Sequence, residues 1–229
     1  LSNLDLRMSI IKNELLERQE RYGDDRRTDL VYADSDISLE DIIERETVAV
    51  TISHLGYIKR TSLDEYREQN RGGKGSKGSL ARNEDFIENL FIGSTHDYLL
   101  VFTERGKCFW LKVYEVPEGS KVSKGRAVQN IIDLPNDDKV MAYLTVKNLD
   151  DDEFLDTHYI IFCTKKGIIK KTSLRAYSRP RQNGIIALSI NDDDDLLEVK
   201  LTNGNCDIML GTSSGRAIRF EEQQVRPMG

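Results

Sequence analysis

The sequence is poor in the residues from which metal sites, disulfide frameworks and membrane spans are built. Its 229 residues include only three cysteines and three histidines. The cysteines are far apart and form no CxxC pair, which is typical of reduced core thiols in a cytoplasmic protein. The histidines are equally scattered, so we expect no metal site. An apolar run of about 18 residues or more, and an apolar N-terminal signal, are both missing, which predicts a soluble protein with no membrane contact.

A catalytic constellation is missing as well. The histidines have no serine or cysteine partner in their sequence context, and the paired carboxylates sit in two runs, 150–156 and 192–195, typical of solvated loops. Neither run has the glycine and terminal glutamate spacing of an EF-hand. A P-loop is excluded because Lys74 is followed by Gly75 and not by serine or threonine. We therefore expect no catalytic residue, metal or cofactor in this chain.

The net charge of −6 argues against a nucleic-acid binder only when the chain is taken as a whole. Residues 1–48 contain 7 Lys/Arg and 13 Asp/Glu, which accounts for the entire −6. Residues 49–229 contain 26 of each, and the two acidic runs supply 9 of those negative charges. The rest of that region therefore carries 26 positive and 17 negative charges, a net of +9. Such an excess suits a nucleic-acid surface if the cations share one face.

The beginning of the chain has the apolar spacing of an amphipathic helix, with an apolar stripe at Leu4, Met8, Ile11, Leu15 and Tyr22. The pattern predicts a helix over about residues 2–22 that ends at Gly23. A stripe of this length must pack on a partner. We expect three parts in the chain: a helical segment over 1–30, an acidic connector with one helical turn over 31–47, and a repeat domain over 48–229.

From Val48 the period changes to the alternation of a strand, and a self-similar unit then repeats. Its marker is an apolar strand, a glycine turn and a basic-apolar strand; the marker glycines are Gly56, Gly106, Gly167 and Gly215. The longest interval contains the acidic stretch 150–156, which we interpret as a loop insertion. A repeat of about 50 residues with several short strands predicts a propeller-like array. The chain stops at Gly229, after three full blades and part of a fourth.

Each marker is followed by a second cluster of glycines and cations. The clusters are 71–74, 123–126, 179–184 and 226–229. The stretch around the first, Gln69–Gly78, holds four glycines and three cations with no acidic residue. Glycine lets backbone amides approach a ligand closely, and Arg and Lys supply charge, so this stretch suits a loop that lies against phosphates. The alternative is a basic surface loop without a ligand.

The same stretch is similar to a family motif. Gln69 to Gly75 reads QNRGGKG and resembles the GyrA-box, QRRGGKG, of the DNA gyrase A family, with Asn70 in place of an arginine. The flanking residues 56–60 and 84–87 resemble the first blade of the family's C-terminal domain. The resemblance extends over essentially the whole chain, and residues 1–30 resemble the end of the family's helical arm. It implies a mainly β fold, a partial β-pinwheel of three to four blades out of six, in which blades exchange a strand.

The resemblance also implies a function, a DNA-wrapping module of a type IIA topoisomerase. Duplex DNA would bend around a basic rim, so that ATP-dependent strand passage yields negative supercoils. The implied partners are double-stranded DNA, the gyrase A cleavage core of the same chain, and the B subunit in an A2B2 complex. ATP and Mg would belong to the cleavage core and the B subunit. The family's DNA-cleaving tyrosine lies upstream, so the chain would be part of an enzyme without carrying a catalytic residue.

The expected DNA contacts are the box and the cations of the later clusters. These residues are Gln69, Arg71, Gly72, Gly73, Lys74, Gly75, Lys77, Lys121, Lys124, Arg126, Arg179, Arg181 and Arg226. Binding would rest on phosphate contacts and DNA bending, and should weaken steeply with salt. Cation pairs within the strands are interpreted as solvated strand faces: Lys59/Arg60, Lys165/Lys166 and Lys170/Lys171. Trp110 is expected to pack in the core or between blades, with base stacking as the alternative.

Two other functions remain open from the sequence alone. One is the C-terminal domain of a topoisomerase IV A-type subunit, which binds DNA but lacks an intact box. The other is a protein-binding propeller with no nucleic-acid role, which would show no salt-sensitive affinity for DNA.

Overall fold

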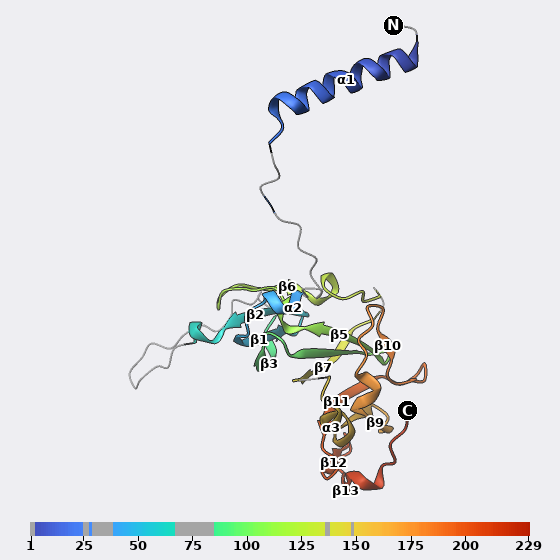
Figure 1. Ribbon diagram of the computed structural model, residues 1–229. Helices are drawn as coiled ribbons and strands as arrows, with labels where there is room; N and C mark the ends of the chain where they lie inside the picture. Colours follow the sequence, from blue (N-terminus) through green and yellow to red (C-terminus); the bar gives the residue numbers. More distant parts are fainter. Residues whose placement is uncertain (1–2, 25–27, 29–38, 67–84, 136–137, 148) are drawn as a thin grey trace, which may run out of the picture. The chain divides into compact units, whose positions relative to one another are not determined.

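The computed structural model describes residues 3–24, 28, 39–66, 85–135, 138–147 and 149–229 (Figure 1). The chain divides into two compact units, Leu1–Ser38 and Leu39–Gly229. The second unit consists mainly of antiparallel strands joined by short turns, which confirms the predicted mainly β fold.

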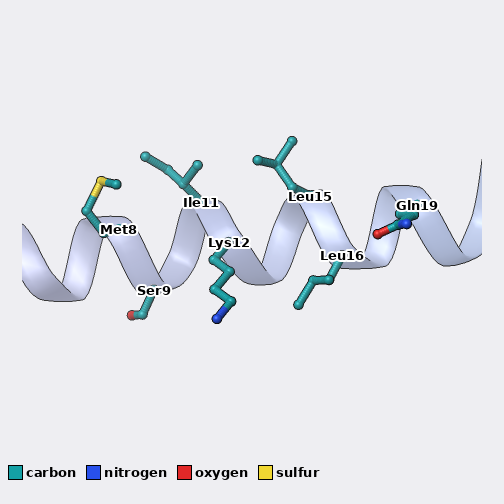
Figure 2. Close-up of a pocket in the computed structure, with 7 residues that line it drawn as sticks. All are labelled: Met8, Ser9, Ile11, Lys12, Leu15, Leu16 and Gln19. Atoms are coloured by element: carbon teal, nitrogen blue, oxygen red, sulfur yellow. The ribbon is translucent and has the colours of Figure 1, made fainter.

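The first unit contains the predicted helix, α1, which spans Leu4–Tyr22. The side chain of Asn3 caps its start by accepting the N–H of Asp5 at 3.0 Å. Figure 2 shows Met8, Ile11 and Leu15 projecting from the same side of the helix. None of the described side chains of α1 is buried, and the partner expected for its apolar stripe stays a prediction.

The second unit begins with α2 (Leu39–Ile42), the helical turn expected in the acidic connector. Four sheets follow among the described residues, in the orders β3–β1–β2–β6, β10–β5–β4–β7, β11–β8–β9 and β12–β13. The strands are β1 (Thr47–Ser53), β2 (Tyr57–Ser62), β3 (Ile87–Ser94), β4 (Tyr98–Thr103), β5 (Lys107–Lys112), β6 (Arg126–Ala127), β7 (Val140–Val146), β8 (Tyr159–Thr164), β9 (Ile169–Ser173), β10 (Ile185–Ile186), β11 (Leu196–Thr202), β12 (Asp207–Gly211) and β13 (Ala217–Glu221). The remaining helices are α3 (Asp152–Thr157) and the 3₁₀ turns η1 (Leu63–Glu65), η2 (Val113–Glu115), η3 (Val128–Asn130), η4 (Leu174–Tyr177) and η5 (Glu222–Gln224).

The four marker glycines are turn residues of one repeated hairpin. In the first, the N–H of Gly56 donates to the carbonyl oxygen of Ser53 at 2.9 Å, and the Ser53 hydroxyl accepts the N–H of Tyr57 at 3.1 Å. Gly56 has a φ of 80°, in the left-handed region that favours glycine. The same bonds recur in the other hairpins, 103–107, 164–168 and 212–216. The repeat predicted from the sequence is therefore a structural repeat.

A buried aspartate ties the next strand of a blade to this turn. In the second blade, Asp138 Oδ1 accepts the N–H groups of Arg105 (3.2 Å) and Lys139 (2.9 Å). Asp194 accepts two N–H groups in the same way in the third blade. Both aspartates are buried. The interpretation of the run 192–195 as a solvated loop is therefore wrong at Asp194, because the backbone N–H groups of the turn need a buried acceptor.

The acidic insertion at 150–156 is also more ordered than the loop we expected. It forms helix α3, which begins where Asp151 Oδ1 accepts the N–H groups of Glu153 and Phe154, each at 3.1 Å. Its Leu155 is buried in the core, and Arg175 forms an ion pair with Asp156. The insertion is a helix because an aspartate cap and one buried leucine favour that conformation over an open loop.

Successive blades exchange their outer strand, as the family resemblance implies. Strand β6 follows β5 in the chain but pairs with β2 of the first sheet, and β10 pairs with β5 of the second. A bridge between Lys171 and Pro227 extends the pattern to the third sheet. The joint requires glycine: at Gly125, with φ of 80°, a Cβ would lie 2.4 Å from the carbonyl oxygen of Ile58. At Gly184 a Cβ would lie 2.8 Å from the carbonyl oxygen of Cys108, so these two glycines let one blade close onto its neighbour.

Two apolar cores lie between successive sheets. One joins the first sheet to the second, where Phe91 and Tyr143 pack with ring centroids 6.4 Å apart. The other joins the second to the third, where Phe102 and Phe162 meet edge to face at 5.4 Å. Strand β4 contributes to both, which explains its unbroken apolar sequence YLLVFT. Trp110 packs against the second core and donates to the Tyr177 carbonyl oxygen at 2.9 Å, as expected for a packing residue.

Candidate nucleic-acid interface

The predicted box and its flank lie outside the described residues. Gln69, Arg71, Gly72, Gly73, Lys74, Gly75 and Lys77 all fall within 67–84. Their role stays a prediction from the sequence. The other candidate cations are described and fall on three segments, each from a different repeat.

The first segment is the loop 117–127, between η2 and the end of β6, here named the exchange loop. The Arg60 N–H donates to the carbonyl oxygen of Pro117 at 3.0 Å, and the Gly119 N–H donates back to the carbonyl oxygen of Arg60 at 2.9 Å. The Thr61 hydroxyl donates to the carbonyl oxygen of Gly119 at 2.8 Å. These bonds hold the exchange loop against β2 before it enters β6.

Three candidate cations come together on the exchange loop. Lys121 is half-buried, and its Nζ lies 4.6 Å from the centroid of the Tyr66 ring, while its N–H donates to Glu65 Oε2 at 2.7 Å. Lys124 and Arg126 are exposed. The loop thus presents positive charge from a backbone that is fixed at several points. This is the arrangement in which lysine and arginine contact phosphates without reading bases.

The other two segments present their cations differently. Arg179 and Arg181 are exposed between η4 and β10, where the Gly184 N–H donates to the Arg181 carbonyl oxygen at 3.0 Å. Ile185 pairs with Cys108 in the second sheet, as Arg126 pairs with Ile58 in the first sheet. Ile185 is therefore the equivalent of Arg126, but it carries no charge. The charges therefore follow the repeat in location but not residue for residue.

The fourth cluster is in a different register from the one the sequence pattern indicated. Arg226 is exposed after η5, and the Met228 N–H donates to the Lys171 carbonyl oxygen at 2.8 Å. In the first sheet the corresponding bond comes from Gly119. Met228 therefore corresponds to Gly119, near the start of the exchange loop. The glycine and cation pattern alone aligns residues 226–229 with the end of that loop, around Gly125.

Some of the strand cations are exposed to solvent, as predicted, and others are buried. Lys165 and Lys166 are exposed and pair with Asp195 and Asp193. Lys59 and Lys171 are buried, with relative exposures of 2% and 4%. The interpretation as solvated faces is wrong for these two, because neighbouring segments cover them and provide buried acceptors for their ammonium groups.

The outer strands use the residue four positions after the marker glycine to hold the next repeat. Arg60 Nε donates to the Val116 carbonyl oxygen at 2.9 Å, and Trp110 donates to the carbonyl oxygen of Tyr177. Lys171 meets Glu222, on η5, at 2.8 Å. This role was not predicted from the sequence. The signal was the constant offset from the glycine, always with a long side chain that carries a donor.

The described residues also include thiol and phenol groups that could take part in chemistry. No group of three metal-ligating side chains is found there, and the three cysteines are free thiols. Burial raises the pKa of the Cys108 thiol well above its usual range, and it also raises the pKa of the Tyr143 and Tyr177 hydroxyls. These groups are protonated at neutral pH and are not activated nucleophiles. In the same part of the chain, no helix is long and apolar enough to cross a membrane.

The stacked antiparallel sheets, the first two of which receive their outer strand from the next repeat, define a β-propeller-like domain. Within that class, the chain belongs to the DNA gyrase C-terminal domain, beta-propeller family, which matches residues 49–94, 97–147, 158–203 and 207–229.

Two curated relatives match almost the whole chain. The A subunit of DNA gyrase from Clostridium acetobutylicum is 44% identical over 222 residues, 97% of this chain and 26% of that protein. The A subunit of DNA gyrase from Haemophilus influenzae is 44% identical over 229 residues, 100% of this chain and 26% of that protein. The chain thus spans about a quarter of the length of these relatives.

Solved structures share the fold. The C-terminal domain of DNA topoisomerase IV superposes with a TM-score of 0.67 at 28% identity, over 82% of this chain and 55% of that one. The DNA gyrase A C-terminal domain superposes with a TM-score of 0.60 at 23% identity, over 80% of this chain and 57% of that one.

Proposed function

We propose that residues 48–229 form the DNA-wrapping part of a gyrase A protein. The observation that carries the proposal is the placement of exposed cations on the segments exchanged between successive blades, in equivalent segments although not at equivalent residues. Cations at regular intervals suit a bent duplex, whose phosphates recur along the curve.

The box fits the same scheme by its position in the sequence. The turn glycines of the first two repeats are 50 residues apart. That offset carries Lys74–Gly75 onto Lys124–Gly125 and Arg71 onto Lys121. We therefore assign Gln69, Gly72, Gly73 and Lys77, with Arg71, Lys74 and Gly75, to the same set of DNA contacts as the cations of the exchange loop. Asn70 removes one cation from the box, so we expect somewhat weaker contact there without loss of function.

The proposal extends to the whole enzyme. DNA wrapped on the basic segments would present a neighbouring duplex, as a positive crossing, to the gyrase A cleavage core. Strand passage, driven by ATP on the B subunit in an A2B2 complex, would then produce negative supercoils, with Mg in the cleavage core and the B subunit. Such an enzyme acts on the chromosome in the cytoplasm. We assign no catalytic residue to this chain.

A topoisomerase IV A-type subunit is the second candidate, favoured by the superposition at a TM-score of 0.67. Two observations weigh toward gyrase: the box agrees at six of seven positions, and the relatives at 44% identity are gyrase A proteins. A protein-binding propeller would leave the recurring cations without a role.

The test is a linking-number assay. Nicked plasmid is sealed by ligase in the presence of increasing amounts of the protein, at low and moderate salt. We expect a protein-dependent, salt-sensitive shift in the topoisomer distribution. The double variant Arg71→Ala/Lys74→Ala should abolish the shift, because two phosphate contacts are lost where the wrap is fastened. Losing two contacts should also lower the salt slope of DNA affinity by about 1.8.

A charge-matched control keeps this result specific. Lys147→Ala/Lys200→Ala removes two exposed lysines outside the candidate segments and should leave the shift intact. An equal loss in both double variants would mean that net charge, and not the box, drives binding. DNA binding without a topoisomer shift would favour the topoisomerase IV alternative, and no salt-sensitive binding would refute the nucleic-acid function.

A further inference from the structure

Lys59 is a buried lysine whose ammonium group holds the backbone of the exchange loop. It lies on β2 opposite Thr51 and is 2% exposed. Its Nζ donates to the carbonyl oxygens of Ser120 (3.0 Å), Lys121 (2.7 Å) and Ser123 (2.9 Å). An ammonium group has three N–H donors, so these acceptors use all of them. Lys59 is therefore not available to a phosphate.

The arrangement places a charged group in a buried site, which is costly unless acceptors surround it. Burial lowers the pKa of Lys59, an effect that the nearby Glu65 carboxylate opposes, and the three carbonyl oxygens provide acceptors for the buried ammonium group. In the third blade the equivalent residue, Lys170, donates to the carbonyl oxygen of Ala187 at 2.9 Å. In the second blade the position is Phe109, a core residue. The three carbonyl oxygens that surround Lys59 Nζ all belong to the exchange loop, which carries Lys121.

Other bonds make the same loop a pre-formed unit. The Ser123 hydroxyl and N–H both donate to the carbonyl oxygen of Ser120, at 2.9 Å each. The Lys121 N–H is held by Glu65, and Thr61 holds Gly119. A loop that is ordered before it meets DNA does not lose that freedom on binding, which raises its affinity.

We propose that Lys59 is a positioning residue for DNA: it orders the exchange loop so that Lys121 and Lys124 engage phosphates of the wrapped duplex. The inference rests on the proposed function and deepens it. Lys59 itself touches no DNA. Its contribution passes entirely through the loop.

The test is a double-mutant cycle on the binding of a fluorescently labelled duplex by the full chain. Lys59→Met keeps the aliphatic stem of the side chain and removes the donors. We expect it to weaken binding by roughly tenfold, because the loop then loses its conformational freedom only when it binds DNA. Lys121→Ala/Lys124→Ala should weaken binding and lower the salt slope by about 1.8. In that background Lys59→Met should have no further effect. Equal losses in both backgrounds would overturn the inference.

Two further variants separate positioning from general stability. Lys112→Met removes a half-buried lysine outside the candidate segments, whose Nζ donates to Glu40 and to the carbonyl oxygen of His96, and should leave DNA affinity unchanged. Thr61→Val removes only the bond to Gly119 and should act in the same direction as Lys59→Met, more weakly, and again only when Lys121 and Lys124 are present. If Lys112→Met weakens binding as much as Lys59→Met, the effect is one of stability and the inference fails.

Amide hydrogen exchange gives a readout that does not depend on DNA. The N–H groups of Gly119, Lys121 and Ser123 all have acceptors, and their exchange should accelerate in Lys59→Met but not in Lys112→Met. Unchanged exchange would refute the ordering role. If the wild-type chain shows no salt-sensitive DNA affinity, the proposed function and this inference both fail. Wild-type binding that Lys59→Met leaves intact overturns the inference alone.

Discussion

Replacing Glu222 with alanine should lower the free energy of unfolding by about 3–5 kcal/mol, because it leaves the buried ammonium of Lys171 without its counter-charge. The two side chains are 0% and 4% exposed and meet at 2.8 Å. The Thr202 hydroxyl donates to Glu222 Oε1 at 2.7 Å, and the Cys206 N–H donates to Oε2 at 3.2 Å. The carboxylate therefore joins the third blade to the start of the fourth.

The same carboxylate makes this stability depend on pH. Burial alone would raise the pKa of Glu222, but the hydrogen bonds from Lys171, Thr202 and the Cys206 amide outweigh it and lower the pKa below its usual value. A group whose pKa is lower in the folded than in the unfolded state stabilises fully above the unfolded value, about 4.3 for glutamate. The contribution should therefore be complete at neutral pH and disappear as the pH falls below about 4.3 toward the folded pKa. Glu222→Gln should remove this part of the pH dependence.

Urea unfolding monitored across the pH range would measure both effects. Glu221→Ala is the matched control: it changes the neighbouring exposed glutamate and should shift stability by less than about 0.5 kcal/mol. Replacing the pair together, Lys171→Met/Glu222→Leu, should cost less than Glu222→Ala because no uncompensated charge is left. A loss for Glu222→Ala no larger than that for Glu221→Ala would show that the pair does not hold the blades together.

Gly106→Ala should destabilise the chain far more than the same change in an identical turn. Gly106 and Gly167 have φ of 80° and 84°, so alanine costs about 1–2 kcal/mol of backbone strain at either. At Gly167 a Cβ would meet nothing within 4 Å, whereas at Gly106 it would lie 2.1 Å from the carbonyl oxygen of Leu188. The overlap should add typically about 1–3 kcal/mol at Gly106 only.

The clash would also separate two blades. The N–H groups of Ala187 and Leu188 both donate to the Gly106 carbonyl oxygen, at 2.8 and 3.0 Å, just after β10 pairs with β5. Gly106→Ala should therefore accelerate amide exchange in β10 and loosen the segment that carries Arg179 and Arg181. The urea unfolding midpoints of Gly106→Ala and Gly167→Ala test this prediction, and we expect the lower midpoint for Gly106→Ala. Equal midpoints would show that the backbone can shift to accommodate the methyl group.

Both predictions concern contacts between repeats, which is where the fold meets the proposed function. The candidate cations lie on segments that leave one blade and lie against another. Their positions along a bent duplex would then depend on how rigidly each blade holds the next. A variant that loosens one joint should weaken wrapping more than it weakens binding of a short duplex, since only wrapping needs several blades in register.

The sequence by itself determined the repeat and the turn of each blade. Glycine at a fixed place after an apolar strand predicts a hairpin, because only glycine adopts the required φ at no cost. Recurrence of that marker about every 50 residues predicts a stack of blades. Helix α1 and its end before Gly23 followed from the apolar spacing. The box was recognised from its residues, and its role stays a prediction.

Only the tertiary structure decided which cations are available to a ligand. Lys59 and Lys165 look alike in the sequence, as basic residues in strand hairpins, yet one is buried and the other exposed. The difference arises because a segment from the next repeat covers Lys59 and supplies its acceptors, whereas Lys165 lies at an open turn. Glu222 follows the same logic, because its partner Lys171 lies in the preceding blade, whereas Asp194 is buried against the turn of its own blade. Burial of a charge depends on partners distant in the chain, and strand exchange brings those partners from the neighbouring blade.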